Sequence, residues 1–162
     1  DMAPALMAMN ARVKISGPKG QKIVPLEKFF IAPRVTALKE NVLEPGELIT
    51  EVQVPAAPAN AKGVFMKKRI RGSWDFALAS VAAMVTLKAG MVQEARIVLG
   101  GVSTIPLRST AAESAIKGKR LDAGSASQAG EAAVAKARPM TQNGYKIDMA
   151  RGMVREALLA VV

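Results

Sequence analysis

The sequence has one dense group of cations, in which four of five consecutive residues are basic: Lys67, Lys68, Arg69 and Arg71. On a β-strand Lys67, Arg69 and Arg71 would share one face, with Phe65 beside them. Such a face can bind phosphates, the anionic edge of a cofactor or an acidic partner, because cations make charge-assisted hydrogen bonds to all three. A strand face covered only by water has the same pattern, so both interpretations stay open. Trp74, the single tryptophan, is expected to pack in the core or at an interface.

Other catalytic chemistry finds little support in the residue types present. Cysteine and histidine are both absent, which excludes disulfides, thiolate nucleophiles, histidine bases and metal sites built on these residues. The segment 17–22 lacks the spacing of a phosphate-binding loop and fits a hairpin turn, and no GxGxxG pattern occurs. Nothing places a serine and a lysine together as a nucleophile pair. Chemistry must therefore come from a cofactor, a partner, or Ser, Lys, Asp, Glu and Tyr side chains.

A glycine pair, Gly100-Gly101, ends an apolar segment that is followed by Pro106 and Arg108. An ordinary strand exit needs one glycine at most. Two in a row indicate a close approach of another backbone or a turn with positive φ.

Short alternating segments bounded by Gly and Pro predict strands over 11–16, 21–25, 48–54, 63–71, 78–88 and 91–99. Hairpin turns are expected at 17–20 and at 89–90, and a helical turn at 26–30. Helical spacing of Ala, Glu and Lys predicts helices over 109–117, 125–138 and 144–161. Ser125 is the expected N-cap of the second helix, and Gly118 and Pro139 are expected to stop the first two.

Strands that precede helices are typical of the α+β class. We therefore expect an antiparallel β-sheet, a meander, packed on one face against a C-terminal layer of about three helices. The small, proline-containing segment 56–61 is the best boundary between two parts of the chain.

The charge balance is strongly basic, with 23 Lys and Arg against 13 Asp and Glu, a net charge of +10. The excess is spread evenly, so no basic tail explains it, and nucleic acid, an anionic ligand or an acidic partner are all compatible with it. An aromatic content of 4% argues against single-stranded nucleic acid. No apolar run reaches the ~18 residues that span a membrane. We expect a cytoplasmic protein with neither a membrane nor a nucleic acid as partner.

Residues 67–82, KKRIRGSWDFALASVA, resemble the "K…RR.S.DFALVSVA" segment of the FAD-binding (medium) subunit of molybdenum hydroxylases. That family includes carbon monoxide, xanthine, nicotine and aldehyde dehydrogenases. Further segments resemble the family in the same order: the "DLAPAL" turn at 1–6, the "ARIALGGV" segment at 95–102 with Pro106 and Arg108, and the last helices at 137–139 and 145–146. The likeness covers essentially the whole chain.

The resemblance implies that residues 1–57 are the C-terminal remainder of an FAD-binding subdomain. It implies that residues 58–162 form a domain like the C-terminal domain of the carbon monoxide dehydrogenase flavoprotein. The family's glycine-rich loops, which cradle the FAD pyrophosphate, are missing from this sequence. That departure and the first residue, Asp1, indicate a piece of a longer subunit, which we expect to be inactive alone and a poor binder of FAD.

The resemblance also carries three cofactor-binding residues onto this sequence. Asp1 matches an acidic flavin contact, Ile49 an apolar residue that packs on the isoalloxazine ring, and Lys67 a basic residue at the flavin edge. No catalytic acid, base or nucleophile is implied, and no metal ligand. The implied partners are a large subunit with the molybdenum cofactor, a small subunit with [2Fe-2S] clusters, and the missing N-terminal part of the same subunit. The implied role is transfer of electrons from these clusters to FAD and on to an acceptor.

Two alternatives from other classes remain at this point. The chain can be a docking domain without flavin, which holds the flavoprotein to its partner subunits. It can also be a basic domain that binds nucleic acid, which the low aromatic content makes the less favoured of the two alternatives.

Overall fold

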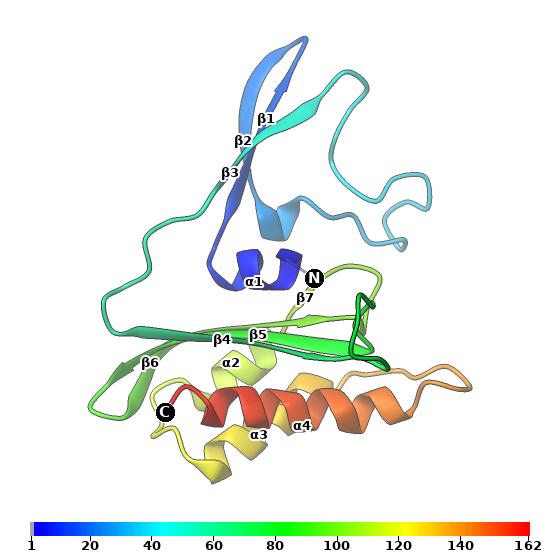
Figure 1. Ribbon diagram of the computed structural model, residues 1–162. Helices are drawn as coiled ribbons and strands as arrows, with labels where there is room; N and C mark the ends of the chain where they lie inside the picture. The colour runs from blue at the N-terminus through cyan, green and yellow to red at the C-terminus, as the bar shows by residue number, and fades with distance from the viewer. Residues whose placement is uncertain (1) are drawn as a thin grey trace.

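The computed structural model describes residues 2–162 and arranges them in layers (Figure 1). A three-stranded sheet lies at one side, and a short helix, α1 (Met2–Ala8), lies between it and a four-stranded sheet. The three remaining helices cover the opposite face of the four-stranded sheet. The expected α+β fold, an antiparallel sheet with a C-terminal helical layer, is confirmed.

The first sheet has the order β2-β1-β3 and contains β1 (Arg12–Gly17), β2 (Gly20–Pro25) and β3 (Leu48–Gln53). All pairs are antiparallel, and the register of β1 with β3 shifts between Lys14 and Ile15. A 3₁₀ turn, η1 (Leu26–Lys28), follows β2 as expected. The predicted hairpin at residues 17–20 and the predicted third strand are both present.

The second sheet is an antiparallel meander of order β4-β5-β6-β7. Its strands are β4 (Ala61–Lys68), β5 (Ala79–Lys88), β6 (Met91–Gly100) and β7 (Leu107–Arg108). Ala89 and Gly90 both have positive φ, 52° and 78°, as the tightest hairpin turn between twisted strands requires. The predicted hairpin is therefore confirmed, whereas the two-residue strand β7 was not predicted.

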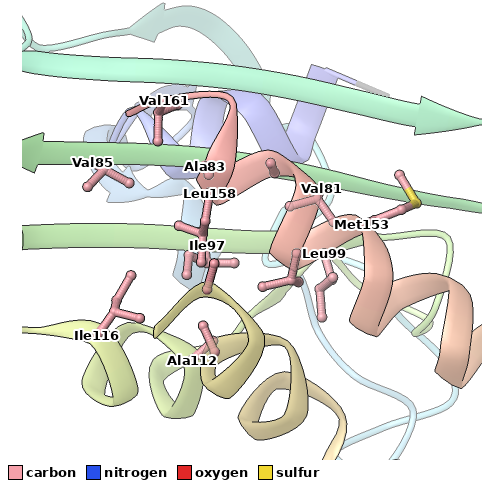
Figure 2. Close-up of a cluster of buried hydrophobic side chains, with 14 of the residues drawn as sticks. Val81, Ala83, Val85, Ile97, Leu99, Ala112, Ile116, Met153, Leu158 and Val161 are labelled. Carbon is pink, nitrogen blue, oxygen red and sulfur yellow. The ribbon is translucent and has the colours of Figure 1, made fainter. Parts of the chain in front are cut away.

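The helical layer consists of α2 (Thr110–Ile116), α3 (Ala123–Val134) and α4 (Tyr145–Leu159). Figure 2 shows their apolar side chains meeting those of β5 and β6 in the main core. Val81, Ile97 and Leu99 face Ile116 and Leu158 there, and each is at most 1% exposed. Among the described helices none combines the length and apolar character needed to cross a membrane.

Helix α1 corrects the expectation of a turn at the start of the chain. Its residues are almost all apolar, and Pro4 stands in the first turn, where a helix tolerates a missing N–H. Met7 and Ala8 pack with Val13 and Ile15 of the first sheet and with the second face of the four-stranded sheet. These residues form a second core, which covers the face of the four-stranded sheet opposite α2, α3 and α4.

The predicted boundaries of two elements are wrong. Strand β4 ends at Lys68 rather than at residue 71, because the chain turns back there and the Leu78 N–H donates to the Lys68 carbonyl at 2.9 Å. Helix α3 ends at Val134, well before Pro139, and it begins at Ala123 with Asp122 as N-cap. Ser125 is the third residue of the helix, and it forms a capping box with Asp122.

The capping box leads to a prediction about stability. Because the Ser125 N–H donates to Asp122 Oδ1 at 2.8 Å, the pKa of Asp122 is lowered. A carboxyl group whose pKa is lower in the folded than in the unfolded state stabilises the fold at pH values above the unfolded-state pKa. This stabilisation is lost as pH falls through the folded-state pKa. We expect Asp122→Ala to lower the Tm of the full-length protein at pH 7 by several degrees. Asp122→Asn should lower it less and should flatten the acid limb of Tm against pH. Equal Tm values for wild type and Asp122→Ala would contradict the capping role.

Candidate functional site

Lys67 lies near the end of β4, which is an edge strand of the four-stranded sheet. Its side chain is half-buried, and Nζ donates a hydrogen bond to the Asp75 carbonyl at 2.6 Å. The cation is therefore held at the base of the loop 69–78, which joins β4 to β5. Its neighbour Lys68 points to the other face of the strand and is exposed.

The loop 69–78 carries the other two cations of the group. Arg69 Nη1 donates to the Ser73 carbonyl at 3.3 Å, and Arg71 Nε lies 3.6 Å from Asp75 Oδ2. The expectation that Lys67, Arg69 and Arg71 share a strand face is wrong, because the strand ends before the two arginines. All three nevertheless line one open pocket, with a volume of about 610 Å³, together with residues 72–76.

Two aromatic side chains stand in the same pocket. Trp74 is 97% exposed and Phe76 is 91% exposed. Trp74 is therefore not packed in the core, and its packing at an interface stays a prediction; Phe76 was not singled out as a candidate. Large apolar side chains left this exposed beside a cation are typical of a surface that binds something. The pattern of Trp74 and Phe76 around Asp75 in a loop was the signal available in the sequence.

The glycine pair Gly100-Gly101 lies beside the loop 69–78, and the absence of side chains at these two positions allows the loop and α1 to pack closely against the end of β6. Gly101 has φ +72°, and a Cβ there would lie 2.8 Å from the Ala77 carbonyl oxygen. A Cβ on Gly100 would lie 2.9 Å from Pro4 Cγ of α1 and would clash with the Ser80 hydroxyl. Both glycines are needed, as predicted, because the loop and α1 approach the end of β6 at these positions.

Ile49 lies on β3, directly opposite Ile15 of β1 in the sheet register. Paired positions point to the same face, yet Ile15 is 1% exposed and Ile49 is 43% exposed. The apolar face that α1 covers thus continues uncovered onto Ile49. Ile49 and Lys67 lie on edge strands of different sheets, and residues 54–60 connect these two strands. The third predicted contact, Asp1, lies outside the described residues.

A network of charges joins the first sheet region to the helical layer. Arg108 donates to both carboxylate oxygens of Glu113, each at 2.9 Å, and Nη1 donates to Glu27 Oε2 at 3.0 Å. Glu113 is 9% exposed, and its Oε1 also accepts the Ile97 N–H at 3.0 Å. Hydrogen bonding to Glu113 raises the pKa of Arg108, although partial burial opposes the shift. Glu113 was not predicted as a buried acid, and within residues 2–162 no group of three acidic side chains forms a metal site.

Two family descriptions match the sequence. Residues 65–161 match "CO dehydrogenase flavoprotein C-terminal domain". Residues 1–57 match "FAD binding domain in molybdopterin dehydrogenase". The first match covers the meander from the second half of β4 onward, the loop 69–78 and helices α2 to α4, and the second covers α1 and the three-stranded sheet.

Curated relatives agree with these descriptions. The carbon monoxide dehydrogenase medium chain of Hydrogenophaga pseudoflava is 33% identical over an alignment of 162 positions, which covers 97% of this chain and 54% of the relative. The aldehyde oxidoreductase FAD-binding subunit PaoB of Escherichia coli is 33% identical over 159 residues, 98% of this chain and 46% of the relative. The chain therefore spans about half the length of the relatives it matches.

Solved structures show the same likeness. Carbon monoxide dehydrogenase from Hydrogenophaga pseudoflava superposes with a TM-score of 0.90 and 32% identity, over 99% of this chain and 55% of that chain. The cyanide-inactivated Cu,Mo-CO dehydrogenase superposes with a TM-score of 0.87 and 28% identity, over 100% of this chain and 57% of that chain.

Proposed function

This chain belongs to the FAD-binding medium subunits of the molybdenum hydroxylases, whose C-terminal portion it matches, and we propose that it forms the surface of such a subunit that contacts the flavin ring. FAD is the cofactor of the complete subunit. In our proposal the complete subunit passes electrons from iron–sulfur clusters to FAD and on to an acceptor. FAD supplies the redox chemistry when it is bound, and the residues of this chain orient it and tune its electrostatic surroundings.

The observation that carries the proposal is the pocket at the end of β4. Lys67 is held there in a fixed position by the Asp75 carbonyl, and exposed Phe76 and Trp74 stand beside it. A flat aromatic ring that gains negative charge on reduction needs an apolar surface to stack on and a cation at its edge. These residues fit both requirements, and we add Phe76 and Trp74 to Lys67 as candidate contacts of the ring.

Ile49 is the proposed apolar contact from the other sheet. Its exposure beside buried Ile15 leaves an apolar surface that a ring or the remaining part of the subunit can cover. We propose residues 1–57 and 58–162 as two domains, a division supported by the separate sheets and by the irregular segment 54–60 between them. Asp1, which lies outside the described residues, stays a proposed contact.

We propose that the partners are a large subunit with the molybdenum cofactor and a small subunit with [2Fe-2S] clusters. The names of the relatives, which are medium chains, support a multi-subunit assembly. The net charge of +10 favours docking to acidic surfaces, since complementary potentials accelerate and orient association.

The test compares FAD binding by the 162-residue chain and by the complete subunit. We expect the complete subunit to contain flavin in near-equal amounts to protein. We expect the chain alone, with native far-UV circular dichroism, to bind FAD more weakly than about 1 µM, because backbone N–H groups for the pyrophosphate are missing. Flavin fluorescence titration measures both. A complete subunit without affinity for FAD would favour the docking domain and contradict the proposal, and tight binding by the chain alone would contradict the need for the missing loops.

A further inference from the structure

A second cavity lies on the helical side of the four-stranded sheet, away from Lys67 and Ile49. It is formed where the end of α3, the start of α4 and the turn between β6 and β7 meet, and its volume is about 490 Å³. Arg34, from the long connection before β3, reaches the same cavity. The volume lies within the range of about 300–1,000 Å³ typical of small-molecule sites.

The floor of this cavity is apolar. Leu99 of β6 and Ala150 of α4 are 1% and 3% exposed, and both belong to the main core. Half-buried Val134 and Ile147 extend the apolar surface toward the rim. The half-buried part of this surface, on Val134 and Ile147, gains free energy when an apolar group displaces water from it.

The rim of the cavity is cationic. Four basic side chains line it, and none of the described lining residues is Asp or Glu: Arg34, Lys136, Arg138 and Lys146. No ion pair within residues 2–162 involves any of these four. Lys146 is anchored by donating to the Gly101 carbonyl at 2.9 Å, and this leaves its ammonium charge uncompensated. Four like charges around an apolar floor repel one another, and a bound anion would offset that repulsion.

We infer that this cavity binds a small amphipathic anion, with a carboxylate or phosphate group among Arg34, Lys136, Arg138 and Lys146 and an apolar body on Leu99, Val134 and Ile147. Arg138 and Arg34 supply planar guanidinium groups, which match the two oxygens of a carboxylate or phosphate. Lys146 supplies a fixed point charge at the start of α4. This site is separate from the proposed flavin surface, because the two cavities share no lining residue.

The test uses octanoate and octyl phosphate as probes on the complete subunit, with isothermal titration calorimetry. We expect both probes to bind. Octanol, which lacks the charge, and acetate, which lacks the apolar body, should bind at least about tenfold more weakly, which corresponds to about 1.4 kcal/mol. Equal binding of octanoate and octanol, or no binding of either anionic probe at millimolar concentration, would overturn the inference.

Matched double variants locate the site. Lys136→Ala with Arg138→Ala removes two exposed rim cations and should weaken octanoate binding at least about tenfold. Lys117→Ala with Arg155→Ala removes two exposed cations that do not line the cavity and should leave binding unchanged. Equal loss in both variants would overturn the inference. So would loss of octanoate binding when the subunit joins its partners, because an acidic part of a partner would then occupy the cavity.

Discussion

Arg108→Met is expected to lower the free energy of unfolding of the complete subunit by about 3 kcal/mol, the largest loss of stability that we predict. Methionine keeps much of the apolar stem and removes the guanidinium. The Glu113 carboxylate, 9% exposed, would then keep the hydrogen bond from the Ile97 N–H and lose both bonds to Arg108. A charge left without its partner in a buried position costs far more than the pair itself contributes. Urea denaturation gives the free energy.

Two further variants separate this cause from a simple loss of packing. In Arg108→Met with Glu113→Leu both charges are gone, so we expect part of the stability to return. In Arg151→Met, a partly exposed arginine that pairs with Asp148 and, at 3.2 Å, with Glu131 is removed, and we expect a loss below about 1 kcal/mol. If Arg108→Met and Arg151→Met cost the same, Glu113 does not depend on Arg108 for its burial.

The ion pair of Arg108 with Glu113 is part of a network that links several elements of the fold. Its Nη1 donates to Glu27 in η1, so the residue joins the region of the first sheet to β7 and α2. Sequence reasoning had no means of finding this network. The Glu113 carboxylate follows the pattern of an ordinary helix residue, and its burial depends on Ile97 and Arg108, which only the folded sheet brings near.

Features set by neighbouring residues were predicted well. The hairpin at Ala89-Gly90 and the stop of α2 at Gly118 follow from backbone preferences that the local sequence carries. The N-cap of α3 was misplaced by three residues, because Asp122 and Ser125 are both good caps and form the capping box together. Helix α1 is too short to show a helical period, and the turn expected there came from the resemblance of residues 1–6 to the family's "DLAPAL" turn.

The candidate site was predicted less completely than the fold. Lys67 was singled out by the family resemblance within a group of cations, but the end of β4 at Lys68 separates it from Arg69 and Arg71. The exposure of Phe76 depends on the path of the loop 69–78, which the residue types alone do not determine. The second cavity is lined by Arg34 and Arg138, which are more than a hundred positions apart in the sequence. Only the tertiary structure shows that they line the same cavity.

The second large effect concerns the flavin. In the complete subunit, Lys67→Met removes the cation that we place at the flavin edge and retains an aliphatic side chain of similar length. We expect the fold to survive, because a partly exposed cation contributes only about 0–1 kcal/mol to stability. The reduction potential of the bound flavin should fall on the order of 30 mV or more, since a nearby cation favours the anionic reduced form and 30 mV corresponds to about 1.4 kcal/mol for two electrons.

Redox titration of the flavin in the complete subunit, wild type against Lys67→Met, Lys67→Arg and Lys68→Met, tests the proposed function most directly. Lys68→Met is the matched control, because it removes one cation from the adjacent, exposed position on the other face of β4. We predict that the potential falls in Lys67→Met, is largely retained in Lys67→Arg, and is unchanged in Lys68→Met. An unchanged potential and flavin content in Lys67→Met, or an equal fall in Lys68→Met, would contradict a flavin contact at Lys67.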